Sequence, residues 1–171
     1  MADPNPSTDT PAPKLSKVRD IKLPAAALAL EIAPDGKALF VACLDGSVLR
    51  IDSESGQRTE LARHESYASG VALVDKGAAL VSAGYDGTLL WHDLAARKII
   101  RRIKAHDFWS WDLAASPDGS RVASVTGQYL AGDYRYSPAP EREPSVKVFD
   151  GKSGELLHAL PHVPPVQDRK S

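Results

Sequence analysis

This sequence has only one cysteine, few aromatic residues and no long apolar run. With Cys43 alone, no intramolecular disulfide can form, and the expected role of Cys43 is that of a small core residue. No uninterrupted apolar stretch approaches the roughly 20 residues of a membrane span, and the N-terminus lacks the basic-then-apolar order of a signal peptide. We therefore expect a cytoplasmic protein with no membrane partner.

The sequence also lacks an excess of either charge, because 21 Lys and Arg face 22 Asp and Glu. The basic clusters at Arg97–Lys98 and Arg101–Lys104 are short and more typical of a solvated strand edge than of a phosphate site. No glycine-rich loop opens a helix, and the five histidines do not stand at metal-ligand spacing. We expect no nucleic-acid partner, no cofactor and no metal.

What the sequence does contain is a repeat. The phrase YDGTLLWHD at Tyr85–Asp93 matches LDGSVLRID at Leu44–Asp52, and the turn residues Asp45 and Asp86 lie 41 residues apart. Three turn glycines, spaced 41 and 42 residues apart, keep the same period: Gly36, Gly77 and Gly119. A fixed period near 40 residues indicates a repeat architecture.

Each unit is expected to hold four short strands separated by turns. In the first unit, alternating apolar runs at 27–33, Ala38–Cys43 and Val48–Asp52 are divided by Pro-Asp-Gly and Asp-Gly turns, and a weaker outer strand follows. The period divides the chain into a disordered proline-rich tail (1–16), an outer strand in the register of a last strand (17–24), three units (25–62, 63–104 and 105–161, the last with an insertion at 129–144) and the truncated start of a further unit (162–171).

Four strands per unit, a His at the unit start, an Asp-Gly turn and a third strand ending in an aromatic-plus-Asp pair resemble the WD-repeat β-propeller family over Ala27–His162. The resemblance implies an all-β fold, in which about three four-stranded blades form part of a ring around a channel. We expect this ring to be incomplete, since a closed propeller needs about four to eight blades.

In that family a blade is pinned by the starting His, a Ser or Thr of the second strand, the turn Asp, and a Trp before the final Asp of the third strand. The matching residues are His64, Ser82 and Asp86 in the second unit and His106 and Ser124 in the third. His92 stands at the Trp position of the second unit, with Trp91 one place early, and Gln128 replaces the turn acid of the third. The resemblance implies a structural role for this set.

His64, Ser82 and Asp86 are also the residue types of a nucleophilic triad. The structural interpretation is preferred, because a buried His and Asp must pair to avoid a desolvation penalty of roughly a few kcal/mol. We expect no catalytic residues in this chain.

Three blades would leave two blade faces uncovered, and uncovered repeat faces expose apolar surface that favours association. We expect the chain to be the N-terminal part of a larger propeller that has been cut short. Self-association into a ring is the alternative.

In the resembled fold, the loop into each first strand and the turn between second and third strands share one face of the disc. Aromatic and arginine side chains supply large contact area in binding surfaces. The expected partner-binding residues are Tyr67, Phe108, Trp109, Tyr129, Tyr134, Arg135, Tyr136 and Arg142. Trp111 is expected in the core by alternation with Leu113, Trp109 could lie in either place, and the insertion at 129–144 either binds a partner or contacts nothing.

The leading hypothesis is a non-catalytic scaffold that presents this loop face to a protein or peptide partner. A small-ligand-binding or enzymatic propeller would use its central channel, but the expected inner strands, including Gly70–Val74, are almost all apolar. The third possibility is a non-functional fragment of a larger propeller.

Overall fold

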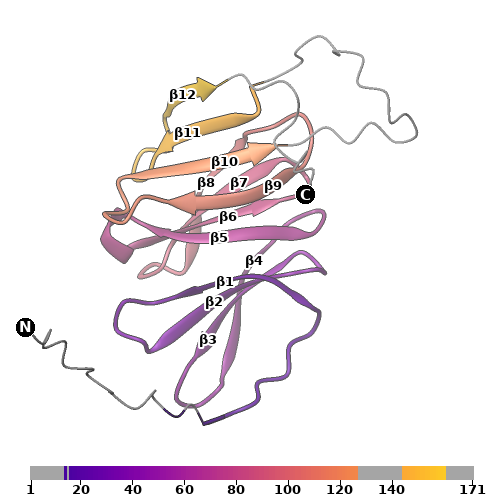
Figure 1. Cartoon of the computed structure of the whole chain (residues 1–171), viewed down its shortest axis with the longest axis vertical. Coiled ribbons are helices and arrows are strands. Elements are labelled where there is room, and N and C mark those ends of the chain that lie inside the picture. The colour runs from indigo at the N-terminus through magenta and orange to yellow at the C-terminus, as the bar shows by residue number, and fades with distance from the viewer. Residues whose placement is uncertain (1–13, 15, 127–143, 161–171) are drawn as a thin grey trace, which may run out of the picture.

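Three four-stranded antiparallel sheets make up the computed structural model, which describes residues 14, 16–126 and 144–160 (Figure 1). Each sheet is formed by four strands consecutive in sequence, as the repeat predicts. Blade 1 consists of β1 (Ala27–Ile32), β2 (Ala38–Cys43), β3 (Ser47–Asp52) and β4 (Arg58–Arg63). Blade 2 consists of β5 (Ala68–Val74), β6 (Ala79–Gly84), β7 (Thr88–Asp93) and β8 (Lys98–Lys104), and blade 3 of β9 (Ser110–Ala115), β10 (Arg121–Thr126), β11 (Val146–Asp150) and β12 (Leu156–Leu160).

The Asp-Gly turns predicted between second and third strands form local hydrogen-bonded caps. Asp45 accepts the backbone N–H of Ser47 at 3.1 Å, and Asp86 accepts that of Thr88 at 2.9 Å. The intervening Gly87 has a positive φ of 72°, and a Cβ there would collide with the carbonyl oxygens of the next blade's entry loop. Only glycine satisfies both the backbone angle and the close approach.

The blades pack face to face through two buried clusters. Between blades 1 and 2 lie mainly small and aliphatic side chains around Phe40 and Leu80. Between blades 2 and 3, Trp91 packs edge-on against Phe149 and its Nε1–H donates to the carbonyl oxygen of Gly151 at 2.9 Å. Cys43 is buried in a third cluster, on the other face of blade 1, in the core role expected for it.

The segment 17–24 forms no strand in the described part of the chain, and its assignment as the outer strand of a further blade stays a prediction. Ile21 and Leu23 instead pack against the buried cluster on the far face of blade 1, and Arg58 donates to the carbonyl oxygen of Lys22 at 2.5 Å. The segment is therefore held against blade 1 by side-chain packing and this hydrogen bond, and it pairs with no strand of the described sheets.

Several predictions concern residues outside the described ranges. These are most of the proline-rich tail, the insertion from Tyr129 onward and the start of a further unit at 162–171. They stay predictions. In the described part of the chain, no helix has the length and apolar character needed to cross a membrane.

Candidate functional site

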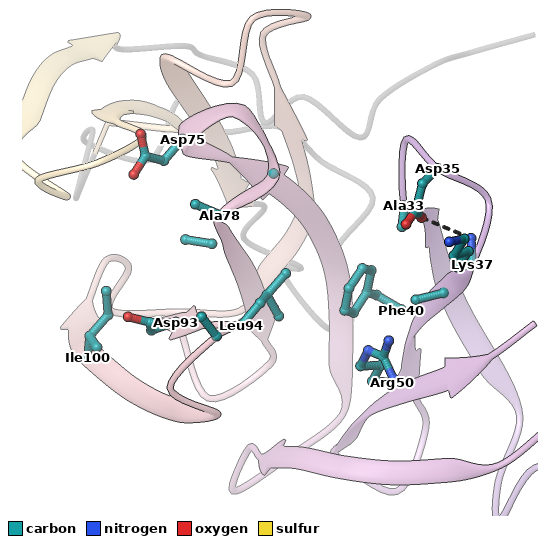
Figure 2. A pocket seen from close by; sticks show the side chains of 14 residues that line it. Ala33, Asp35, Lys37, Phe40, Arg50, Asp75, Ala78, Asp93, Leu94 and Ile100 are labelled. Atoms are coloured by element: carbon teal, nitrogen blue, oxygen red, sulfur yellow. Dashed lines mark hydrogen bonds between the residues drawn. The ribbon is translucent and has the colours of Figure 1, made fainter.

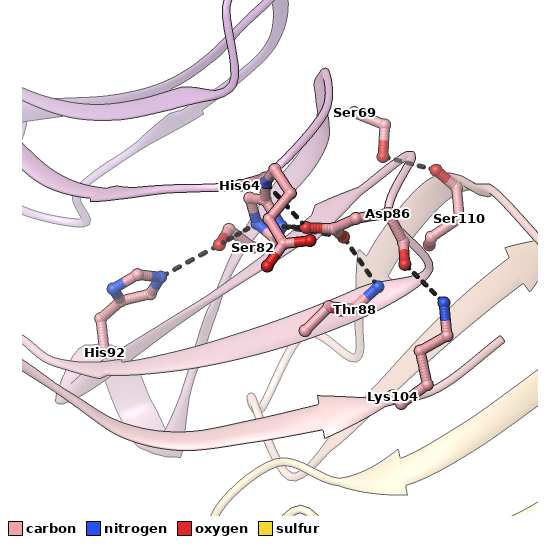
Figure 3. Close-up of polar contacts among 9 residues, drawn as sticks. His64, Ser69, Ser82, Asp86, Thr88, His92, Lys104 and Ser110 are labelled. Carbon is pink, nitrogen blue, oxygen red and sulfur yellow. Dashed lines mark hydrogen bonds and ion pairs between the residues drawn. The ribbon is translucent and has the colours of Figure 1, made fainter. Parts of the chain in front are cut away.

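The predicted polar set of blade 2 is brought together in one buried hydrogen-bonded chain (Figure 3). His64 precedes β5, and its Nδ1 lies 3.2 Å from each carboxylate oxygen of Asp86. Its Nε2 lies 2.9 Å from Ser82 Oγ on β6, and Ser82 Oγ lies 3.0 Å from His92 Nε2 on β7. His92 therefore occupies the place of the Trp indole in the resembled family, as a ring N–H facing the serine.

The proton positions follow from donor and acceptor counts. Asp86 accepts from His64 Nδ1, which leaves His64 Nε2 to accept the Ser82 hydroxyl proton. Ser82 Oγ then accepts from His92 Nε2–H, and the buried His92 Nδ1 has no hydrogen-bond partner. This assignment leaves a lone pair rather than an N–H unpaired, the less costly defect of the two.

The same chain perturbs two titratable groups. Burial disfavours the charged ring of His92, and the nearby His64 adds to this, so the pKa of His92 falls to about 4. For Asp86, burial would raise the pKa, but the hydrogen bonds from His64 and from the backbone of Thr88 and Glu65 outweigh it and lower the pKa to about 2.

This geometry argues for a structural role of the set. Ser82 and His64 are buried, so a substrate carbonyl has no approach to the Ser82 hydroxyl. In blade 3 the related pair is His106 and Ser124, 3.0 Å apart, and the Ser110 hydroxyl lies 2.8 Å from that of Ser124. Within the described ranges, no group of three metal-binding side chains converges.

Gly84 is predicted to be intolerant of any side chain, because a Cβ there would overlap the His64 ring and lie 2.8 Å from an Asp86 carboxylate oxygen. Gly84→Ala should lower the free energy of unfolding by roughly 1–3 kcal/mol, the usual cost of overpacking a well-filled site. Urea denaturation measures this cost. In a His64→Ala background the same change should cost less, because only the contact with the Asp86 carboxylate remains, and an equal cost in both backgrounds would contradict the assigned collision.

Five aromatic side chains gather on the loop face, and we call Tyr67, Tyr85, Phe108, Trp109 and Trp111 the aromatic rim. Tyr85 is the centre of the rim: its ring centroid lies 5.4 Å from Tyr67, 5.3 Å from Trp109 and 5.1 Å from Trp111. Trp109 also lies 4.5 Å from Phe108 and 5.5 Å from Trp111. The rim thus joins three connections that are far apart in sequence.

Two hydrogen bonds to backbone carbonyl oxygens hold the rim in place. The Tyr85 N–H donates to the carbonyl oxygen of Tyr67 at 2.8 Å, which ties the β6–β7 turn to the loop that enters blade 2. The Thr126 hydroxyl donates to the carbonyl oxygen of Trp109 at 2.7 Å, which ties the end of β10 to the loop that enters blade 3. The aromatic side chains are therefore presented by anchored connections.

The structure places only part of the predicted partner-binding set. Tyr67, Phe108 and Trp109 lie in the rim, whereas the predicted tyrosines and arginines from Tyr129 to Arg142 lie outside the described residues. Tyr85 was missed, although its place just before the Asp-Gly turn is a signal for the same face. The expectation for Trp111 was wrong: a β-bulge between Val125 and Thr126 breaks the alternation, and Trp111 is only half-buried.

An open cleft lies at the opposite ends of the strands, between blades 1 and 2 (Figure 2). Phe40 and Ile100 supply apolar surface there, and Lys37 and Arg50 face a region that also holds carboxylates. The charged residues come from separate turns and strands, and none of them forms a buried acid-base pair. The cleft supports no catalytic assignment.

Comparisons with protein-family models and with curated proteins find no match for this chain. Solved structures do match. Hydrazine synthase of Kuenenia stuttgartiensis is 19% identical to this chain with a TM-score of 0.65. The aligned region covers 88% of this chain and 40% of the synthase chain. The WD40 repeats of RRP9 are 18% identical with a TM-score of 0.67, and the aligned region covers 84% of this chain and 41% of the RRP9 chain. The structure of U3-55K is 18% identical with a TM-score of 0.68, and the aligned region covers 84% of this chain and 42% of that one.

These identities establish the fold and nothing further, and the chain spans about two fifths of the length of each matched structure. The three sheets and the WD40 neighbours agree with the resemblance found in the sequence. This chain has the fold of a WD-repeat β-propeller segment.

Proposed function

We propose that this chain is a non-catalytic interaction scaffold that binds a protein or peptide partner through its aromatic rim. The observation that carries the proposal is the rim itself, in which four aromatic rings from three connections and Trp111 of β9 meet on one face. Tyr67 is 46% exposed, and the other four rings are half-buried. Aromatic side chains held at low entropic cost are the residues that contribute most to protein interfaces.

Support for a scaffold also comes from the WD40 repeats among the similar folds, since repeat folds of this kind offer an extended surface for partners. The predicted tyrosines and arginines at 129–142 would enlarge that surface, and they belong to the proposal as candidate contacts. A cytoplasmic location is part of the same proposal.

One similar fold belongs to a hydrazine synthase, so an enzymatic role is the second candidate. Catalysis requires reachable groups held in a mutual hydrogen-bonding geometry. In the described part of the chain, His64, Ser82 and Asp86 have that geometry, but the side chains of His64 and Ser82 are buried. The scaffold is therefore the better-supported function, and a fragment without function is the outcome if no partner depends on the rim.

The test is the combined variant Tyr67→Ala with Trp109→Ala. We expect it to weaken binding of a rim-dependent partner at least tenfold, since truncation of interface aromatics commonly costs more than about 1.4 kcal/mol. Partners captured by the immobilised chain are quantified by mass spectrometry, and their affinity for each variant is measured by titration.

Leu157→Ala serves as the matched control, because Leu157 is an exposed large residue on β12 and lies outside the rim. Circular dichroism verifies that each variant is folded. If the double variant and Leu157→Ala retain every partner equally, the rim is not the binding site.

A further inference from the structure

The cleft between blades 1 and 2 lies at a place where the interface between blades 2 and 3 is closed. It has a volume of about 550 Å³, with Phe40 and Arg50 on the wall from blade 1 and Leu94 and Ile100 on the wall from blade 2 (Figure 2). Both flanking blades belong to the described chain. The cleft is therefore a property of this one interface, and the repeat shows which residues make it differ from the next.

The first difference is a side chain. Arg50 stands 41 residues before Trp91, so both have the same place in the third strand of their blades. Trp91 is fully buried between blades 2 and 3, where its Nε1–H donates to the carbonyl oxygen of Gly151 at 2.9 Å. Arg50 is only partly buried and lines the cleft. One interface thus has a cation where the other has an indole.

The second difference is in the backbone. Between blades 2 and 3, the Asp75 N–H donates to the carbonyl oxygen of Gly119 at 2.9 Å and joins the turns that follow the first strands. Pro34 has the Asp75 position in blade 1, 41 residues earlier, and proline has no N–H to donate. The equivalent bond to the carbonyl oxygen of Gly77 cannot form. Both differences open the same end of the interface, since Gly77 and Arg50 line one cleft.

Two backbone acceptors remain at the cleft as a result. Leu94 directly follows the last residue of β7, as Gly151 follows that of β11, so their carbonyl oxygens have equivalent places. The oxygens of Gly151 and Gly119 each accept a hydrogen bond across the interface between blades 2 and 3. Within the described residues, those of Leu94 and Gly77 accept none from blade 1. An occupant that supplies an indole N–H and a backbone N–H matches both acceptors.

The charges at the cleft favour a neutral occupant. Two cations and three carboxylates line it: Lys37, Arg50, Asp35, Asp75 and Asp93. Because the two signs nearly cancel, the cleft does not select an anion. Arg50 pairs with the apolar Phe40 across β2 and β3, and no hydrogen bond of its guanidinium is found among the described residues. A guanidinium in such a place stacks well on an aromatic ring.

We propose that this cleft binds a tryptophan side chain of a partner peptide. The indole ring lies against Arg50, and its N–H donates to the carbonyl oxygen of Leu94. A backbone N–H of the peptide donates to the carbonyl oxygen of Gly77. The occupant thus supplies the two donors that Trp91 and Asp75 supply in the next interface. The cleft and the aromatic rim lie at opposite ends of the strands, so this second site does not depend on the function proposed for the rim.

The test uses N-acetyl-tryptophanamide, which carries an indole N–H and backbone N–H groups on one residue. Titrated into the isotope-labelled whole chain, it should shift the amide NMR signals of Leu94, Ala95 and Ile100 with a Kd of roughly 1 mM or tighter. N-acetyl-leucinamide lacks the ring and free indole lacks the backbone N–H, so each should bind roughly threefold more weakly or worse. If N-acetyl-leucinamide binds equally well, the proposal is overturned. Equal affinity for free indole would overturn the peptide as the occupant.

Arg50→Trp introduces the side chain that closes the next interface, and it should abolish binding of N-acetyl-tryptophanamide. Undiminished binding to this variant would contradict the assigned place. Arg50→Ala keeps the cleft open and provides a second test if Arg50→Trp does not fold. It should weaken binding roughly two- to fivefold, the size of a cation–π contact at an exposed site, and unchanged affinity would contradict the stacking on Arg50.

Arg102→Trp is the matched control, because Arg102 is an exposed arginine of β8 that does not line the cleft. This variant should bind the probe as the unchanged chain does. The rim variant Tyr67→Ala with Trp109→Ala should also keep its affinity for the probe, whatever its effect on rim-dependent partners. Loss of binding in the rim variant would place the probe on the rim and overturn the assignment to the cleft. Circular dichroism verifies that each variant is folded.

Discussion

Replacement of Trp91 by alanine is expected to lower the free energy of unfolding by about 3–5 kcal/mol, the largest effect of any single substitution proposed for this chain. Trp91 is fully buried between blades 2 and 3, where it packs against Phe149 and donates to the carbonyl oxygen of Gly151. The change leaves a large cavity and an unpaired buried acceptor. Because repeats are stabilised by their neighbours, the amides of blade 3 should be the first to lose their protection against hydrogen exchange.

Chemical denaturation followed by circular dichroism measures the loss, and hydrogen exchange of the β10 and β11 amides locates it. Trp91→Phe is the informative control, since it keeps most of the apolar volume and removes only the indole donor. It should cost less than half as much as the alanine change. A loss below about 1 kcal/mol for Trp91→Ala would contradict the central place of Trp91 in the interface.

Acidification is expected to destabilise the chain by about 3 kcal/mol through His92 alone. The pKa of His92 falls from its ordinary value of 6.5 to about 4 in the folded chain, and each unit is worth about 1.36 kcal/mol. Between these values the unfolded chain binds more protons than the folded chain. Stability is therefore fully present above pH 6.5 and is lost as the pH falls toward 4.

The measurement is the free energy of unfolding at several pH values across this window. His92→Gln provides the control, because a glutamine amide can donate to Ser82 Oγ and does not titrate. This variant should have a shallower pH dependence between 6.5 and 4. The stability that Asp86 contributes is present above its ordinary pKa of 3.8 and is lost only as the pH falls from there toward its folded pKa of about 2, which lies below this window. Identical pH profiles for His92→Gln and the unchanged chain would contradict the role given to His92.

His92 and Trp91 also show how much of the polar set could be predicted from the sequence. The sequence identified the positions of His64, Ser82 and Asp86, and the structure joins them within hydrogen-bonding distance. It did not predict that His92 would complete the chain as a ring donor to Ser82. Nor did it predict that Trp91 would point to the other face and hold blade 3. Adjacent residues of a strand face opposite sides, so a shift of one place exchanges their partners.

The aromatic rim shows a different limit. Tyr67, Phe108 and Trp109 were expected on the loop face because their connections share it. Tyr85 and Trp111 join them through a turn and a β-bulge. A bulge changes the direction of one side chain without leaving a mark in the hydrophobic pattern, so alternation alone placed Trp111 in the core.

The sequence by itself determined the period, the number and order of strands in each described blade, and the turns between them. These features depend on local chemistry, on Asp-Gly turns and on alternating side chains, which are read one short segment at a time. Only the tertiary structure decided which blade faces are covered, that residues 17–24 pack without pairing, and which aromatic rings meet. Leu30 and Val71 occupy the same position in the repeat, yet one is open and the other buried, because burial depends on neighbours that lie a whole blade away.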